Sequence, residues 1–465
     1  MSASRGDPPV VENGGWRWGP FTFRLPFLHT RPCWPELLQG ILVATATGLA
    51  LVPILTGYFG MSFEEGIATS LLISTFLVIA LWVFGDPYAP GWTTPALPLV
   101  LAFVLARYDT PDLRFQAMAA LSISYALLVF ALGVTRAGPR LMAWLPPTLR
   151  ATILIGSALA AFRQVFVTDA PRFLHQQPIS ILLACALCLA LVFSAPVHRL
   201  QARHAWLRRV TALGLLPGFL AAAIVGPLVG EVNYQIEWGW LWPPVGDAVA
   251  KMSPFSIGWP PLSMFLDVVP LVLLTYVIQF GDWVTGDAVL RDAQPSRTDD
   301  PIRIDPRRSH LALALRNFGS ALVVPFFPTQ GSLWAGVHVV VTSRWREGPG
   351  AMRDLHSGLV SYYLMGLPLI YFLLPLLTGL QPLMGVALAI TLVTTGFACA
   401  YIGMAIPRTN AERGCAVLGG VALSLFDPWI ALALAVAAWW LLVGREPKAP
   451  ARAEAPARVT GEEPR

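Results

Sequence analysis

The chain has 465 residues, of which 55% are hydrophobic and only 13% are charged, and its mean hydropathy is +0.60. A soluble domain carries about 25% charged residues, so this composition excludes an ordinary soluble protein and indicates a polytopic membrane protein. The net charge of +5 is spread over short loops, which argues against nucleic-acid binding, and the five cysteines predict neither a disulfide framework nor a metal site.

Apolar stretches predict an all-α protein with fourteen transmembrane segments. The first seven lie near 37–57, 64–84, 95–106, 115–135, 147–166, 178–195 and 209–229. A polar, Trp-rich connection over 230–262 precedes the second seven, near 263–290, 310–325, 331–343, 357–378, 383–406, 415–426 and 428–444. With a cytoplasmic N-terminus, 27 of the 32 basic residues fall on cytoplasmic segments, six of them between Arg291 and Arg316. We therefore predict a multi-pass protein of the cell inner (plasma) membrane with both termini in the cytoplasm.

The third and tenth segments are too short to span a bilayer, and a polar break precedes each. The breaks read Pro90-Gly91-Trp92-Thr93-Thr94-Pro95 and Pro328-Thr329-Gln330-Gly331-Ser332. Because seven is odd, the second half must be inverted relative to the first, and paired broken helices in inverted repeats indicate a transporter's substrate site. Free amides at the N-termini of the two half-helices suit an anionic or electronegative ligand. The alternative is simple N-capping of short helices. The predicted substrate-binding residues at the breaks are Trp92, Thr93, Thr94, Thr329, Gln330 and Ser332.

The segment 263–290 carries one polar stripe, formed by Thr275, Gln279, Asp282 and Gly286 at helical spacing. A carboxylate within a membrane segment predicts a functional site, so Asp282 is the predicted coupling group, with H⁺ or Na⁺ as the ion and no other cofactor. The alternative is that Asp282 lies hydrated near the cytoplasmic end. Gln279 joins the predicted substrate site, and Thr275, Asn317 and His338 are predicted to support it.

Several motifs resemble the nucleobase–ascorbate (xanthine/uracil permease) family. The span from Gln39 to Val52-Pro53 is similar to that family's first segment, and Leu145-Pro146-Pro147 with Ile155-Gly156 to its fifth. Phe280-Gly281-Asp282 resembles the end of its eighth-segment motif. Asn317-Phe318-Gly319 and Phe327-Pro328-Thr329 resemble its ninth segment and the start of its tenth. The resemblance implies a core domain moving against a gate domain, and gate-domain homodimers.

The resemblance departs from the family pattern at the residues that would bind a nucleobase. The family's eighth-segment Glu falls on Ile278, and its tenth-segment Glu-Asn pair falls on Leu333-Trp334. The sulfate permeases share the seven-plus-seven plan and bind anions between the half-helices, but typically add a cytoplasmic C-terminal domain. The implied parts are a cytoplasmic segment 1–36, a core domain (37–136 and 262–378), a gate domain (137–261 and 379–444) and a disordered tail 445–465.

These observations predict a secondary active transporter, working by elevator-type alternating access in the lipid bilayer. Its small-molecule substrate is predicted to be an organic anion or a nucleobase-like heterocycle. The alternatives are an inorganic-anion transporter or a channel of sulfate-permease type. The sequence lacks the HExxH, GxSxG and Walker patterns, so we do not expect an enzyme. The Arg-rich stretch 291–316 is predicted to be a cytoplasmic anchor touching anionic lipid.

Overall fold

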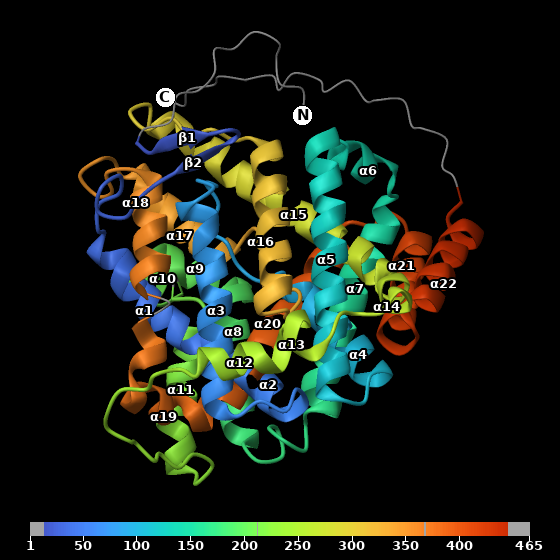
Figure 1. Ribbon diagram of the computed structural model, residues 1–465, viewed down its shortest axis with the longest axis horizontal. Coiled ribbons are helices and arrows are strands. Elements are labelled where there is room, and N and C mark those ends of the chain that lie inside the picture. The colour runs from blue at the N-terminus through green and yellow to red at the C-terminus, as the bar shows by residue number, and fades with distance from the viewer. Residues whose placement is uncertain (1–13, 212, 367–368, 445–465) are drawn as a thin grey trace, which may run out of the picture.

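The computed structural model describes residues 14–211, 213–366 and 369–444, and it shows a helical bundle with one short β-hairpin (Figure 1). The first half contains β1 (Trp16–Trp18), β2 (Phe21–Phe23), α1 (Trp34–Thr47), η1 (Gly48–Leu51), α2 (Val52–Tyr58), α3 (Phe63–Trp82), η2 (Thr94–Ala96), α4 (Leu97–Arg107), α5 (Pro111–Thr135), α6 (Gly138–Trp144), α7 (Pro147–Arg163), η3 (Gln164–Thr168), α8 (Pro178–Phe193), α9 (Ala195–Arg203), α10 (Ala205–Thr211), α11 (Leu216–Leu228), α12 (Val245–Met252) and α13 (Pro254–Ile257). The second half contains α14 (Leu262–Asp267), α15 (Val269–Ala293), η4 (Gln294–Ser296), α16 (Pro306–Val323), α17 (Ala335–Arg346), α18 (Leu355–Val360), η5 (Ser361–Gly366), η6 (Leu369–Phe372), α19 (Leu374–Leu380), η7 (Gln381–Leu383), α20 (Met384–Ala405), α21 (Asn410–Leu425) and α22 (Pro428–Leu442).

Helices long and apolar enough to cross a membrane confirm the predicted class of protein. There are five in the described part of the chain, and α8 with α9, bent by 62°, would make a sixth. The five are Phe63–Trp82, Pro111–Thr135, Pro147–Thr168, Val269–Ser296 and Leu374–Ala405. The predicted count of fourteen segments is not confirmed, because several apolar helices are shorter than a span.

Two predicted segments are broken helices rather than continuous ones. The predicted segment 37–57 changes from α1 to α2 through the 3-10 turn η1, and Pro53 lies at the start of α2. The predicted segment 357–378 is divided among α18, η5, η6 and α19. The polar, Trp-rich connection 230–262 contains two short helices, α12 and α13.

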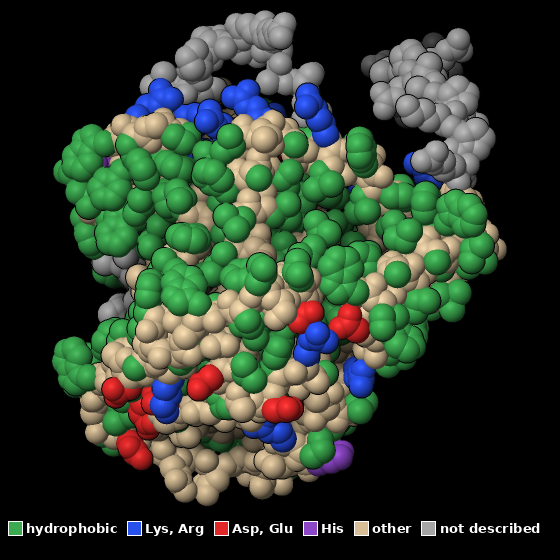
Figure 2. All heavy atoms as spheres, turned by 45° about the vertical axis from the view of Figure 1, so that its right-hand side comes forward, with side chains coloured by type: hydrophobic (Ala, Val, Ile, Leu, Met, Phe, Trp, Pro, Cys, Tyr) green, Lys and Arg blue, Asp and Glu red, His purple; other side chains and the backbone are tan. Residues whose placement is uncertain are grey.

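The outer surface has the character expected of a protein surrounded by lipid. Figure 2 shows a broad hydrophobic band between basic side chains at the upper rim and charges of both signs toward the lower end. Exposed apolar residues line α5, α20, α21 and α22, among them Leu127, Ile402, Leu418 and Leu434. Apolar area of this extent would be unfavourable in water, so it indicates a lipid-facing surface.

The predicted N-terminal segment 1–36 is folded against the bundle where it is described. The Trp18 indole donates to the Val83 carbonyl at 2.9 Å, and the Arg24 amide donates to the Trp82 carbonyl at 2.8 Å. Further along, the Arg31 amide donates to Ser357 Oγ at 2.9 Å. Residues 1–13 and the predicted disordered tail 445–465 lie outside the described residues.

The Arg-rich stretch 291–316 is built into the protein rather than forming a free anchor, which corrects the prediction. Arg297 is 1% exposed, and its guanidinium donates to the carbonyls of Trp345, Met352 and Arg353. Arg308 and Arg316 lie buried in α16. Acidic residues in or beside the stretch pair with exposed or half-buried arginines, in the pairs Arg303–Asp305 and Arg346–Asp292. Most arginines of the stretch are therefore buried or paired with acidic residues, and Arg291 and Arg307 stay exposed.

Candidate functional site

The two broken segments lie side by side and satisfy each other's backbone. Gly91 and Gly331 form an antiparallel bridge. The Thr93 amide donates to the Pro328 carbonyl at 3.0 Å, and the Trp334 amide donates to the Ala89 carbonyl at 2.7 Å. Irregular backbone at membrane depth persists only when its polar groups find such partners. The half-helices, η2 with α4 and α17, therefore both begin at this crossing, as the sequence predicted.

The two broken segments approach each other so closely at the crossing that each needs a glycine there. A Cβ atom added at Gly331 would lie 2.6 Å from the Gly91 carbonyl oxygen and 2.6 Å from Thr93 Oγ1. A Cβ atom at Gly91 would lie 2.7 Å from Trp334 Cβ. Since real Cβ contacts of this length essentially never occur, these two glycines set how closely the half-helices meet.

Gln279 of α15 links the two half-helix beginnings and is completely buried. Its Oε1 accepts hydrogen bonds from Thr93 Oγ1 at 2.8 Å and from the Ser332 amide at 3.3 Å. Its Nε2 donates to Ser332 Oγ and, at 3.4 Å, to Asp282 Oδ2. The structure thus brings together four of the predicted site residues, Thr93, Gln279, Asp282 and Ser332, which we call the Gln279 centre.

Replacing Gln279 by Leu, which is similar in volume, should destabilise this arrangement. The Thr93 hydroxyl and the Ser332 amide would lose their acceptor, and each buried unpaired donor costs about 1–3 kcal/mol. We expect a lower thermal unfolding temperature of the detergent-solubilised protein. Thr285→Val on the exposed side of the same helix is the matched control, because Thr285 bonds only to the carbonyl of its own helix turn. If Gln279→Leu unfolds at the same temperature as the wild type, the Gln279 centre does not contribute to the stability of the protein.

Arg316 is a site residue that the sequence reasoning missed. It was counted with the cytoplasmic loop, whereas the structure places it in α16 with 1% exposure. Its Nη2 donates to the Gly331 carbonyl at 2.9 Å, and its Nη1 lies 3.5 Å from Gln330 Oε1. Its Nε is buried without a hydrogen-bond partner, and no carboxylate within salt-bridge distance is found for it in the described residues. The signal was available, since an arginine inside an apolar run predicts function.

Other predicted residues hold the broken backbone or lie apart from the Gln279 centre. Asn317 Nδ2 donates to the Gln330 carbonyl at 2.9 Å, and Gln330 Nε2 donates to the Ile73 carbonyl at 3.2 Å. His338 Nδ1 accepts from the Ala89 amide at 3.3 Å, which ties α17 to the first break. The hydroxyls of the three remaining threonines bond to nearby carbonyls of their own segments: Thr94 to Trp92, Thr275 to Leu271 and Thr329 to Phe326.

The site offers hydrogen-bond donors that protein groups leave free. Ala335 and Gly336, at the start of α17, are exposed, and their amides are among those that a helix leaves unpaired. The Tyr125 hydroxyl is buried without a partner and lies close enough to Arg316 and Asp282 to interact electrostatically. Together with Arg316 Nε, these groups suit a ligand that accepts hydrogen bonds and carries negative charge.

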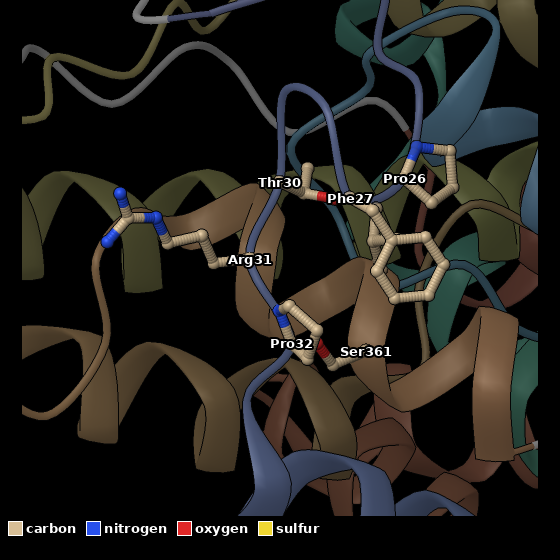
Figure 3. A pocket seen from close by; sticks show the side chains of 7 residues that line it. Pro26, Phe27, Thr30, Arg31, Pro32 and Ser361 are labelled. Carbon is tan, nitrogen blue, oxygen red and sulfur yellow. The ribbon is translucent and has the colours of Figure 1, made fainter.

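Two hollows elsewhere in the protein are too small for a substrate. One lies between the N-terminal loop and the 360–361 turn, where Arg31 extends away from Phe27 (Figure 3). The other lies between Val165, Phe173 and Leu388. Each has a volume of about 10 Å³, the space of roughly one water molecule. Neither touches the Gln279 centre.

Comparison with solved structures shows that the fold is similar to folds found in membrane transporters. The chain is similar to murine Slc26a9, described as an anion transporter of Solute Carrier 26 in the inward-facing state, with a TM-score of 0.50 and 14% identity. This match covers 90% of the chain and 69% of Slc26a9. A second SLC26A9 structure gives a TM-score of 0.49 at 14% identity, covering 89% and 65% of the two chains. The transmembrane domain of the cyanobacterium bicarbonate transporter BicA gives 0.48 at 13% identity, covering 86% and 96%. No protein-family model and no curated protein sequence matches the chain.

The resemblance to the nucleobase–ascorbate family is therefore wrong, because the fold is similar to that of Slc26a9, a member of Solute Carrier family 26. Some motifs behind the resemblance lie at the ends of helices, since Pro147 starts α7 and Phe327-Pro328 precedes the crossing. Others lie inside helices: Phe280-Gly281-Asp282 in α15 and Asn317-Phe318-Gly319 in α16. The residues that would recognise a base, absent at Ile278 and Leu333-Trp334, carried the distinguishing information.

Proposed function

We propose that this chain is a secondary transporter of a small anion, which binds at the start of the two half-helices beside Arg316. The observation that carries the proposal is the burial of Arg316 beside the crossing, where its Nη2 donates to the Gly331 carbonyl and its Nε has no hydrogen-bond partner. A guanidinium stays protonated in proteins, and a buried charge is costly unless it is compensated. Asp86 interacts with Arg316 electrostatically but forms no ion pair with it in the described residues. The N-termini of α4 and α17 add further partial positive charge at the crossing. A bound anion would add negative charge next to the guanidinium.

The proposed movement is that of a core domain (37–136 and 262–378) against a gate domain (137–261 and 379–444), with fourteen membrane segments and cytoplasmic termini. Helix packing supports this division, because α5 packs on α16 within the proposed core and α7 packs on α20 and α21 within the proposed gate. Several polar links join the two parts: Tyr58 donates to Asp169, Arg107 lies 3.9 Å from Asp427, and Lys251 lies 2.8 Å from Glu65. Sliding of one domain past the other would break these links and would open the site alternately to the two sides of the membrane. Dimerisation through the gate domain belongs to the same proposal.

Asp282 is the proposed coupling group, acting through H⁺ or Na⁺. It is half-buried in α15 and accepts a hydrogen bond from Gln279 Nε2. An ion bound to Asp282 would therefore lie next to the Gln279 centre. Asp282→Asn should abolish ion-driven accumulation while leaving passive anion exchange, because the amide keeps the shape but neither takes up a proton nor attracts a cation. Counterflow and gradient-driven uptake in proteoliposomes separate the two. Unchanged accumulation would remove Asp282 from the mechanism.

Uptake by proteoliposomes containing the purified full chain tests the proposed function. Halides, inorganic oxyanions and small carboxylates are offered in turn, with a neutral sugar as the control solute. Saturable uptake of one anion class is the expected result. Flux that rises linearly with concentration would indicate a channel instead, and absence of anion flux with all three classes would contradict the proposal.

A further inference from the structure

A basic, amphipathic elbow follows α8 and lies apart from the site described above. The chain turns by 62° after α8 and continues as α9 and α10, labelled in the left half of Figure 1. Arg199 and Arg203 are one helical turn apart on α9 and are both exposed. Leu200 and Trp206, with exposed fractions of 46% and 63%, provide apolar surface beside them. We call residues 195–211 the basic elbow.

The turn is fixed by hydrogen bonds rather than frayed. Gln201 Nε2 donates to the Leu191 carbonyl at 3.2 Å, and His198 Nε2 lies 2.8 Å from the Val192 carbonyl. These carbonyls belong to the last turn of α8, where a helix leaves its acceptors unpaired. Side chains of α9 thus cap α8, and they hold α9 at 62° to it. A basic amphipathic helix held at such an angle suits the bilayer surface.

The exposed arginines of α9 have no acidic partner. The sequence contains no Asp or Glu between Asp169 and Glu231. Within the described residues, neither Arg199 nor Arg203 forms an ion pair, whereas Arg297 and Arg303 of the stretch 291–316 each have an acidic partner. Two more arginines follow in the sequence of α10. We therefore expect the basic elbow, and not the stretch 291–316, to contact anionic lipid.

We propose that the basic elbow binds the headgroups of acidic phospholipids, with Arg199 and Arg203 on the phosphates and with Leu200 and Trp206 in the interface. Basic residues on an amphipathic helix next to a membrane segment are attracted to anionic headgroups, and Trp favours the headgroup level. The elbow lies within the proposed gate domain, so lipid binding would anchor that domain to the bilayer. The inference does not depend on which solute the protein carries.

Thermal unfolding of the detergent-solubilised full chain during titration with phosphatidylglycerol tests the proposal. Phosphatidylglycerol should raise the unfolding temperature of the wild type more than phosphatidylcholine does, and free glycerol phosphate should have no effect. In Arg199→Gln/Arg203→Gln the apparent affinity for phosphatidylglycerol should fall about 30-fold, from roughly 1 kcal/mol per basic residue. The matched control is Arg408→Gln/Arg413→Gln, an exposed pair beside Glu412, which should bind as the wild type does.

Three outcomes would overturn the proposal: an equal effect of both lipids on the wild type, an equal effect of glycerol phosphate, or unchanged affinity in the Arg199/Arg203 variant. If that variant does not fold, salt gives the answer with the wild type alone. The phosphatidylglycerol effect should shrink as NaCl rises toward 1 M, where the screening length falls to about 3 Å. A phosphatidylglycerol effect that persists undiminished at 1 M NaCl contradicts a charge-based headgroup site.

Discussion

Arg316→Gln is expected to abolish high-affinity anion binding and to reduce transport to near background. The substitution removes a buried positive charge that contacts the broken segment before the second half-helix, through the Gly331 carbonyl. Hydrogen bonds to charged groups contribute about 1.5–3 kcal/mol, which corresponds to a loss of affinity of roughly 10- to 150-fold. The free amides of α17 would remain, so weak binding should persist. Anion-dependent thermal stabilisation and proteoliposome uptake measure the two effects.

Two further variants distinguish loss of charge from loss of structure. Arg316→Lys keeps the charge but not the planar fork that reaches both Gly331 and Gln330, so it should recover part of the affinity. Arg413→Gln removes an exposed positive charge far along the sequence and should leave affinity unchanged. If Arg316→Gln binds anions as tightly as the wild type, Arg316 is a structural residue and the proposed site is wrong.

Hydropathy and chain breakers were sufficient to predict the membrane class and the crossing of the half-helices. Long apolar runs such as 64–84 and 115–135 coincide with α3 and α5. A helix that spans a bilayer must be long and nearly free of charged residues, and both properties can be read from the sequence. The Gly91 and Gly331 breaks could be predicted because irregular backbone inside an apolar region needs a partner. Both inferences depend only on local sequence.

What could not be predicted depends on which residues meet in space. Gln279, Thr93 and Ser332 lie far apart in the sequence. Only the fold brings the side-chain amide of Gln279 within hydrogen-bond distance of both Thr93 and Ser332. Arg316 was misassigned because charge counting treats every arginine near a loop alike, although α16 carries this one deep into the bundle. The family resemblance was wrong for a related reason: short motifs such as Leu145-Pro146-Pro147 at the start of α7 describe local structure and not the residues that meet at the site.

Gly331→Ala should lower the stability of the protein more than any other single-methyl change at the site. The added Cβ would lie 2.6 Å from the Gly91 carbonyl oxygen and 2.8 Å from the Thr93 amide nitrogen, and both are held by backbone pairing. Overpacking of this kind costs about 1–3 kcal/mol, and here it would also push the half-helices apart. We expect a lower unfolding temperature together with loss of anion stabilisation, since the donors on the two half-helices would no longer converge.

Gly336→Ala is the matched control, because a Cβ atom at Gly336 meets nothing within 4 Å although it lies only five residues away in the same half-helix region. Alanine is also the better helix former, so this variant should be as stable as the wild type or slightly more stable. Its small methyl group should leave the amides of α17 accessible, and anion binding should persist. Equal unfolding temperatures for the two variants would show that the crossing can relax, and that close approach of the half-helices is not what positions the site.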